Sequence, residues 1–114
     1  MQQIVDLHSD TDFQAMDVAL LSIAFDSAEE QRAGITEYGI RDVPMLIDAN
    51  GDVSRRYDVL KWAVASGEPG HTFILINEAG RIAWIKDYGS PTLPDPVMYV
   101  APGELIAQIS VHLQ

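Results

Sequence analysis

Apolar residues follow one another in one part of the chain and recur at helical spacing in others. The run from Val18 to Phe25 is apolar except for Ser22. This pattern is typical of a parallel-sheet strand that is covered on both faces. A weak helical stripe precedes the run and comprises Ile4, Val5, Leu7 and Phe13. We therefore expect the chain to open inside a helix and to continue into a central strand.

A second helix is predicted directly after this strand. Ser27 supplies a side-chain oxygen for an N-cap, and Glu29 and Glu30 fall in the first turn, where the helix dipole favours negative charge. Gly39 can adopt the left-handed conformation that ends a helix. The apolar positions expected to face the core are Ala28, Ala33, Ile35 and Tyr38.

The middle of the chain predicts a second strand and a short helix. The strand covers residues 43–47, and Asn50 and Gly51 mark the turn after it. Apolar residues spaced by about four then predict a brief helix within 53–60, with its two arginines on the exposed side.

The last part of the chain predicts a hairpin, a loop and a helix. Strands over 72–76 and 81–85 flank a turn in which Gly80 can take positive φ. Four prolines between residues 91 and 102 predict an extended loop, and a helix becomes possible at Gly103. The apolar face of this helix comprises Leu105, Ile106, Ile109 and Leu113. The whole order predicts an α/β fold with a mixed sheet between helical layers.

The amino-acid composition excludes several classes of function. The 114 residues carry 17 acidic and 7 basic side chains, a formal net charge of -10, which disfavours binding to nucleic acid. No apolar stretch approaches the roughly 20 residues that span a bilayer, so no membrane association is expected. With no basic, apolar leader at Met1, a cytoplasmic location is predicted. The chain has no cysteine, which excludes disulfides, thiolate zinc sites and internal thiol catalysis.

Three stretches carry a family resemblance: DVALLSIAFDSAEEQRAGITEYGI, VPMLIDANGDVSRRYDV and GEPGHTFILINEAGRIAWI. In this order they resemble the thioredoxin-fold peroxiredoxins of the alkyl hydroperoxide reductase and thiol-specific antioxidant superfamily. The resemblance covers roughly residues 17–88, and its most specific parts are the Asp-x-x-Gly turn and the Thr-Phe hairpin. The tail PVMYVAPGELIAQISVHL is similar to the closing loop and helix of redoxin-type members.

The resemblance implies a thioredoxin-like three-layer α/β/α sandwich, in a single domain over residues 1–114. It also implies a parent activity, in which a cysteine thiolate attacks a hydroperoxide and the resulting sulfenic acid is recycled by a second thiol. The family fold begins with a strand and a loop that bears this cysteine. Relative to that fold, the chain is expected to be truncated at its N-terminus, without the first strand and the catalytic loop.

Other functional positions of the family are also altered. The family's arginine, which helps to hold the thiolate and the peroxide, aligns with Gly70, and Pro69 is one position away from the cis-proline of thioredoxins. No catalytic residue can therefore be carried over from the family.

Loss of the first strand would leave a gap in the sheet between the strand at 18–25 and the strand at 72–76, as the resemblance implies. Each buried, unpaired backbone group costs about 1 to 3 kcal/mol, so the gap must be closed. We expect these two strands to pair directly, or a second copy to fill the gap by strand exchange in a homodimer. A thiol reductant protein is expected as a partner only if a longer form exists.

Two groups of polar residues could suggest metal sites. His8, Asp10 and Asp12 have ligand chemistry, but their place at a helix end favours capping. The polar residues that begin at Asp48 do not make a complete calcium loop, because Gly51 is at the fourth position of the loop and not the sixth. Neither a metal nor a cofactor is expected.

His71 is the one functional candidate, since the resemblance places it opposite the missing cysteine loop. Glu68 could pair with it, although a histidine at the start of a strand is more often structural. The large aromatic residues are interpreted as core or interface: Trp62, Trp84, Tyr88 and Tyr99. The expected function is that of a peroxiredoxin-like redox-family member that is inactive alone. The alternative is a non-catalytic thioredoxin-fold binding or self-association module, and an enzyme built on His71 ranks lowest.

Overall fold

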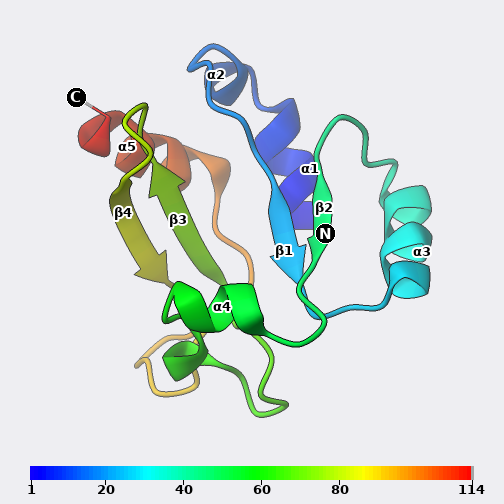
Figure 1. Ribbon diagram of the computed structural model, residues 1–114. Helices are drawn as coiled ribbons and strands as arrows, with labels where there is room; N and C mark the ends of the chain where they lie inside the picture. Colours follow the sequence, from blue (N-terminus) through cyan, green and yellow to red (C-terminus); the bar gives the residue numbers. More distant parts are fainter. Residues whose placement is uncertain (114) are drawn as a thin grey trace. The chain divides into compact units, whose positions relative to one another are not determined.

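The computed structural model describes residues 1–113 and divides the chain into two compact units (Figure 1). The first unit is Met1–Asp58, and the second begins at Val59. Each unit has its own two-stranded sheet and its own buried residues. The single domain over residues 1–114 stays a prediction.

The first unit opens in a helix, as the sequence predicts. α1 spans Gln2–Ser9 and α2 spans Thr11–Gln14. Asp10 separates them, and its carboxylate accepts hydrogen bonds from the backbone N–H groups of Asp12 and Phe13 at 2.9 and 3.2 Å. Two of the four unpaired N–H groups of α2 are thereby satisfied, so Asp10 acts as an N-cap.

The sheet of the first unit is a short parallel pair. β1 (Ser22–Ala24) pairs with β2 (Met45–Ile47), and Ile23 lies opposite Leu46 in the register. The predicted strand over 18–25 is wrong in its length, since only three residues join the ladder. The expected cover on both faces is also wrong, because 38% of Ile23 and 45% of Leu46 are exposed.

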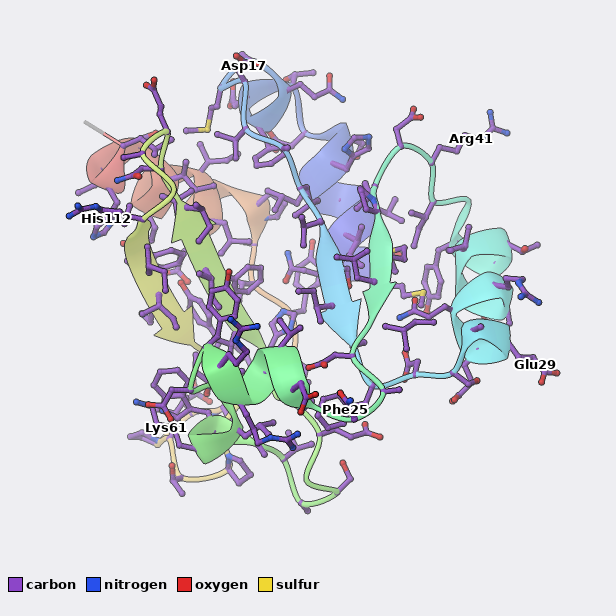
Figure 2. All side chains as sticks on the ribbon, in the orientation of Figure 1. Asp17, Phe25, Glu29, Arg41, Lys61 and His112 are labelled. Carbon is purple, nitrogen blue, oxygen red and sulfur yellow. The ribbon has the colours of Figure 1, made fainter. Side chains whose placement is uncertain are left out.

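Between these strands, α3 (Ala28–Tyr38) has the ends that the sequence predicts. The Ser27 hydroxyl accepts from the Glu30 N–H at 3.1 Å, and the Glu30 carboxylate accepts from the Ser27 N–H at 3.0 Å, which is a capping box. Gly39 ends the helix at φ +64°. Figure 2 shows Glu29, in the first turn, pointing outward.

The predicted apolar face of α3 is wrong. Its buried residues are Gln31 and Gly34, whereas Tyr38 is 40% exposed. Gly34 is buried because the Met1 side chain lies against it: a Cβ at position 34 would come within 2.2 Å of the Met1 sulfur. A small residue, and not a large apolar one, is therefore what packs on this side of the helix.

The loop after β2 is organised by the buried carboxylate of Asp48. It accepts hydrogen bonds from the Val53 N–H, the Ser54 N–H and the Ser54 hydroxyl at 3.1, 2.8 and 2.8 Å. These bonds fix the start of α4 (Asp52–Arg56), which follows Gly51 at φ +74°. Burial would raise the pKa of Asp48, but these hydrogen bonds outweigh burial and hold the pKa below its usual value.

The second unit is built on an antiparallel hairpin. After the 3₁₀ turn η1 (Leu60–Trp62), β3 (Thr72–Ile76) pairs with β4 (Ile82–Asp87). Gly80 has φ +77° in the connecting turn, so the predicted hairpin is confirmed.

The last helix covers this hairpin. α5 (Pro102–His112) buries Leu105 and Ile109, two of the four apolar positions expected to form its face. At its C-terminal end the His112 ring lies 5.8 Å from the Trp84 ring of β4, measured between centroids; Figure 2 labels His112. The apolar residues that form the core of the unit are Val59, Leu75, Tyr88, Val100, Leu105 and Ile109.

Within residues 1–113 the strands form one parallel pair, in the first unit, and one antiparallel pair, in the second. The expectation that β1 and β3 close the gap by direct pairing stays a prediction. In the same part of the chain, no helix combines the length and the apolar character needed to cross a membrane.

Candidate functional site

His71 lies directly before β3 and belongs to an extension of the hairpin. Its carbonyl oxygen accepts a hydrogen bond from the Tyr88 N–H at 2.9 Å, one residue beyond the end of β4. The backbone around His71 is therefore held by the same antiparallel pairing that forms the hairpin.

Asp87 is the carboxylate of this site. It lies opposite Thr72 in the register and is only 8% exposed. One of its oxygens accepts from the Thr72 hydroxyl at 2.7 Å, and the other accepts from the Ser90 N–H at 2.7 Å. Both oxygens of this buried group are thus hydrogen-bonded, as a buried carboxylate requires.

Ser90 completes the cluster without being a nucleophile. It is 2% exposed, and its hydroxyl shares a hydrogen bond with the Thr92 hydroxyl at 2.9 Å. An attacking serine needs a base within hydrogen-bond reach and an open path to substrate. Ser90 is closed off from solvent, so its role is to hold the loop after β4.

An aromatic ring and a glycine lie against His71, which is half-buried. The Phe73 ring meets the His71 ring edge-on at 4.9 Å, and the Tyr88 ring meets Phe73 in the same way at 5.8 Å. On another side, a Cβ on Gly89 would lie 3.0 Å from the backbone nitrogen of His71 and 3.1 Å from its Cβ. Only glycine allows this close approach of the two segments.

The charge state of His71 follows from these neighbours. Burial lowers its pKa below the usual value, and the negative charge of Asp87 opposes this effect without cancelling it. Asp87, which the sequence did not single out, is thus the carboxylate that acts electrostatically on His71. At neutral pH the ring is uncharged, so it can donate or accept a hydrogen bond but cannot supply the permanent positive charge of an arginine.

The other candidates in the sequence have structural roles. Asp10 caps α2, as expected, and Asp48 holds the start of α4. Over residues 1–113, no three His, Cys, Asp or Glu side chains come together in a way that could hold a metal ion. His8 instead lines a cavity of about 130 Å³ in the first unit, together with Ile4, Arg41 and Val43.

Comparisons with known proteins agree with this fold. The sequence model of the AhpC/TSA family matches residues 1–85. The chain belongs to the AhpC/TSA family. A search of curated protein sequences gives no significant match.

Two solved structures show the same fold. The chain is 20% identical to AhpC of Enterococcus faecalis, with a TM-score of 0.73, and the match covers 96% of this chain and 64% of that one. It is 16% identical to AhpC of Mycobacterium tuberculosis, with a TM-score of 0.72, and this match covers 96% and 59% of the two chains. The thioredoxin-like α/β fold class and the family resemblance are therefore confirmed. The chain spans about three fifths of the length of these AhpC structures.

The sequence could have indicated one further part of the site. Thr72 and Asp87 are polar residues at the open end of a hairpin whose strands are mostly apolar, and a Gly-Ser pair follows Tyr88 at once. Such a pattern is typical of a carboxylate that caps a turn. The contact between Ser90 and Thr92 depends on the conformation of the loop, and no comparable sequence pattern indicates it.

The lowered pKa of the His71 imidazole can be tested by titration. In an NMR titration, the His71 imidazole is expected to titrate below the ordinary histidine pKa of about 6.5. An Asp87→Asn variant should lower this pKa further, because it removes the negative charge that favours the imidazolium. Glu78→Gln, in the turn at the other end of the hairpin, is the matched control and should leave the pKa unchanged.

The same shift fixes the sign of a stability effect. The folded state binds the His71 proton less tightly than the unfolded state. The contribution of His71 to the free energy of unfolding is therefore fully present above about pH 6.5 and is lost as the pH falls through the folded pKa. A titration at or above 6.5 would show that burial does not dominate this site.

Proposed function

We propose that this chain is a peroxiredoxin-like redox-family domain that does not catalyse the reduction of hydroperoxides by itself. Membership of the AhpC/TSA family supports the redox kinship. The observation that carries the proposal is the lack of any cysteine in the 114 residues. The attacking group in the family's chemistry is a thiolate, and no other side chain has comparable nucleophilicity toward a peroxide oxygen.

The site around His71 supports the same conclusion. The Thr72 hydroxyl donates to Asp87, the Ser90 and Thr92 hydroxyls share a hydrogen bond, and the imidazole is uncharged at neutral pH. Such a site can orient a bound hydroxyl or thiol through hydrogen bonds, but it contains no group that could form and release a covalent oxygen adduct. His71 therefore remains a candidate for positioning a reactant that another molecule supplies.

The proposal also bears on the partners and the location of the chain. A thiol reductant protein would become a partner only of a form that includes a cysteine, and the antioxidant activity belongs to that form. A cytoplasmic location is proposed on the sequence features alone. No nucleic acid partner is proposed, because acidic side chains exceed basic ones by ten.

A peroxide-consumption assay tests the proposal. With hydrogen peroxide in large excess and dithiothreitol or thioredoxin as reductant, the chain is expected to add no sustained turnover to the background rate. A His71→Ala variant is the matched control and should give the same rate. Multiple turnovers per chain, reduced by the His71→Ala substitution, would refute the proposal and assign the activity to this site.

A second candidate function is self-association. The parallel pair of β1 and β2 exposes Ile23 and Leu46, which lie opposite each other in the register, together with Leu21 at 52% exposure. A parallel pair is ordinarily buried on both faces, and each of these strands also has one edge with unpaired backbone groups. A homodimer could bury this apolar face, or it could add a strand that pairs with an open edge.

Light scattering coupled to size exclusion tests this candidate. We expect the chain to elute as a dimer and a Leu46→Lys variant to shift to the monomer, because a lysine would place a charge in the apolar contact. Val111→Lys is the matched control: Val111 is 64% exposed on α5, and the variant should remain dimeric. A strictly monomeric parent chain at all concentrations would exclude the self-association function.

A further inference from the structure

The sulfur of this chain is confined to its four methionines, and they differ in exposure. Met98, in the loop before α5, is 58% exposed and is the only exposed one of the four. The others are half-buried: Met1, Met16 and Met45. A thioether is oxidised by peroxide according to its accessibility, so the most exposed methionine, Met98, is expected to react first.

Met98 is also placed by the backbone. The Val97 N–H donates to the Tyr88 carbonyl at 2.8 Å, which sets the two segments side by side. The next pair along these segments is Gly89 and Met98, and a Cβ on Gly89 would come within 2.7 Å of the Met98 sulfur. The thioether therefore lies on the bare backbone of Gly89, on the residue that also contacts His71.

We propose that hydroperoxides oxidise Met98 in preference to the other methionines, and that the sulfoxide releases residues 97–98 from Tyr88 and Gly89. The sulfur lone pair attacks one peroxide oxygen, an S–O bond forms and the O–O bond breaks. The leaving oxygen takes the remaining proton and departs as water or an alcohol. The sulfur loses two electrons and the peroxide gains them, so the reaction needs no further reactant.

Release follows from the geometry of the contact. Oxidation adds an oxygen and a strong dipole to a sulfur that packs against Gly89. The Met98 sulfur and the His71 backbone nitrogen lie 2.7 and 3.0 Å from the position that a Cβ on Gly89 would take, so the three segments meet closely and leave little room for an added oxygen. We expect the segment that carries Met98 to move away, and the Val97 hydrogen bond to Tyr88 is the backbone bond beside it.

This modification is independent of the proposed function. It consumes one peroxide per thioether and stops, whereas thiol peroxidase activity turns over. A chain that fails the turnover assay can still oxidise at Met98, and a chain with sustained turnover can leave Met98 intact. The two results are read separately, one as a rate of peroxide loss and the other as a mass increase on one peptide.

The experiment oxidises the folded chain with hydrogen peroxide and follows each methionine by peptide mass spectrometry. Met98 is expected to gain one oxygen several times faster than Met16 or Met45. Hydrogen exchange is measured on the same samples, and the Val97 amide should lose protection as Met98 sulfoxide accumulates. Equal oxidation rates among the methionines, or an unchanged Val97 amide after complete oxidation of Met98, would overturn the proposal.

Two variants separate oxidation from simple loss of the side chain. Met98→Leu keeps a similar apolar volume without sulfur, so the Val97 amide should stay protected after peroxide treatment. Met16→Leu, in the first unit, is the matched control and should lose Val97 protection as the parent chain does. Loss of protection in the peroxide-treated Met98→Leu variant would place the sensitive sulfur elsewhere and refute the role of Met98.

Discussion

The buried carboxylate of Asp87 is the interaction on which the second unit depends most. It receives the Thr72 hydroxyl from the first residue of β3 and the Ser90 N–H from the loop beyond β4. One side chain thus closes the open end of the hairpin and fixes the turn that follows. Hydrogen bonds to a charged group are stronger than those between neutral groups, and a buried one that loses its partners is costly. His71, Tyr88 and Gly89 lie beside this closure, where the Tyr88 N–H donates to the His71 carbonyl.

Elements whose ends have local causes could be predicted from the sequence. Ser27 and Glu30 form the capping box at the start of α3, and Gly39 and Gly80 take the positive φ values that their positions suggested. The predictions that failed depend on distant parts of the chain. The run 18–25 has the pattern of a long buried strand, yet β1 is limited by the length of its partner β2. The buried face of α3 is set by the Met1 side chain against Gly34, which no periodicity can reveal.

The candidate site could be predicted only in part for the same reason. The family resemblance points to His71, and membership of the AhpC/TSA family bears out that resemblance. Its partner Asp87 is 16 residues away along the chain, and only the register of the hairpin brings the two ends together. The result is a redox-family fold whose polar residues stabilise a loop. Its exposed sulfur-containing residue is a methionine, and a thioether reacts with peroxide more slowly than a thiolate and only once per side chain.

The central claim is that Asp87 holds the hairpin end and the loop after it as one structure. Hydrogen exchange at the Ser90 amide tests this most directly, because that N–H donates to the carboxylate itself. In an Asp87→Ala variant the account predicts a large loss of protection at Ser90 and at Tyr88, with an overall loss of stability of about 1 to 3 kcal/mol. Unchanged protection of the Ser90 amide in this variant would contradict the account.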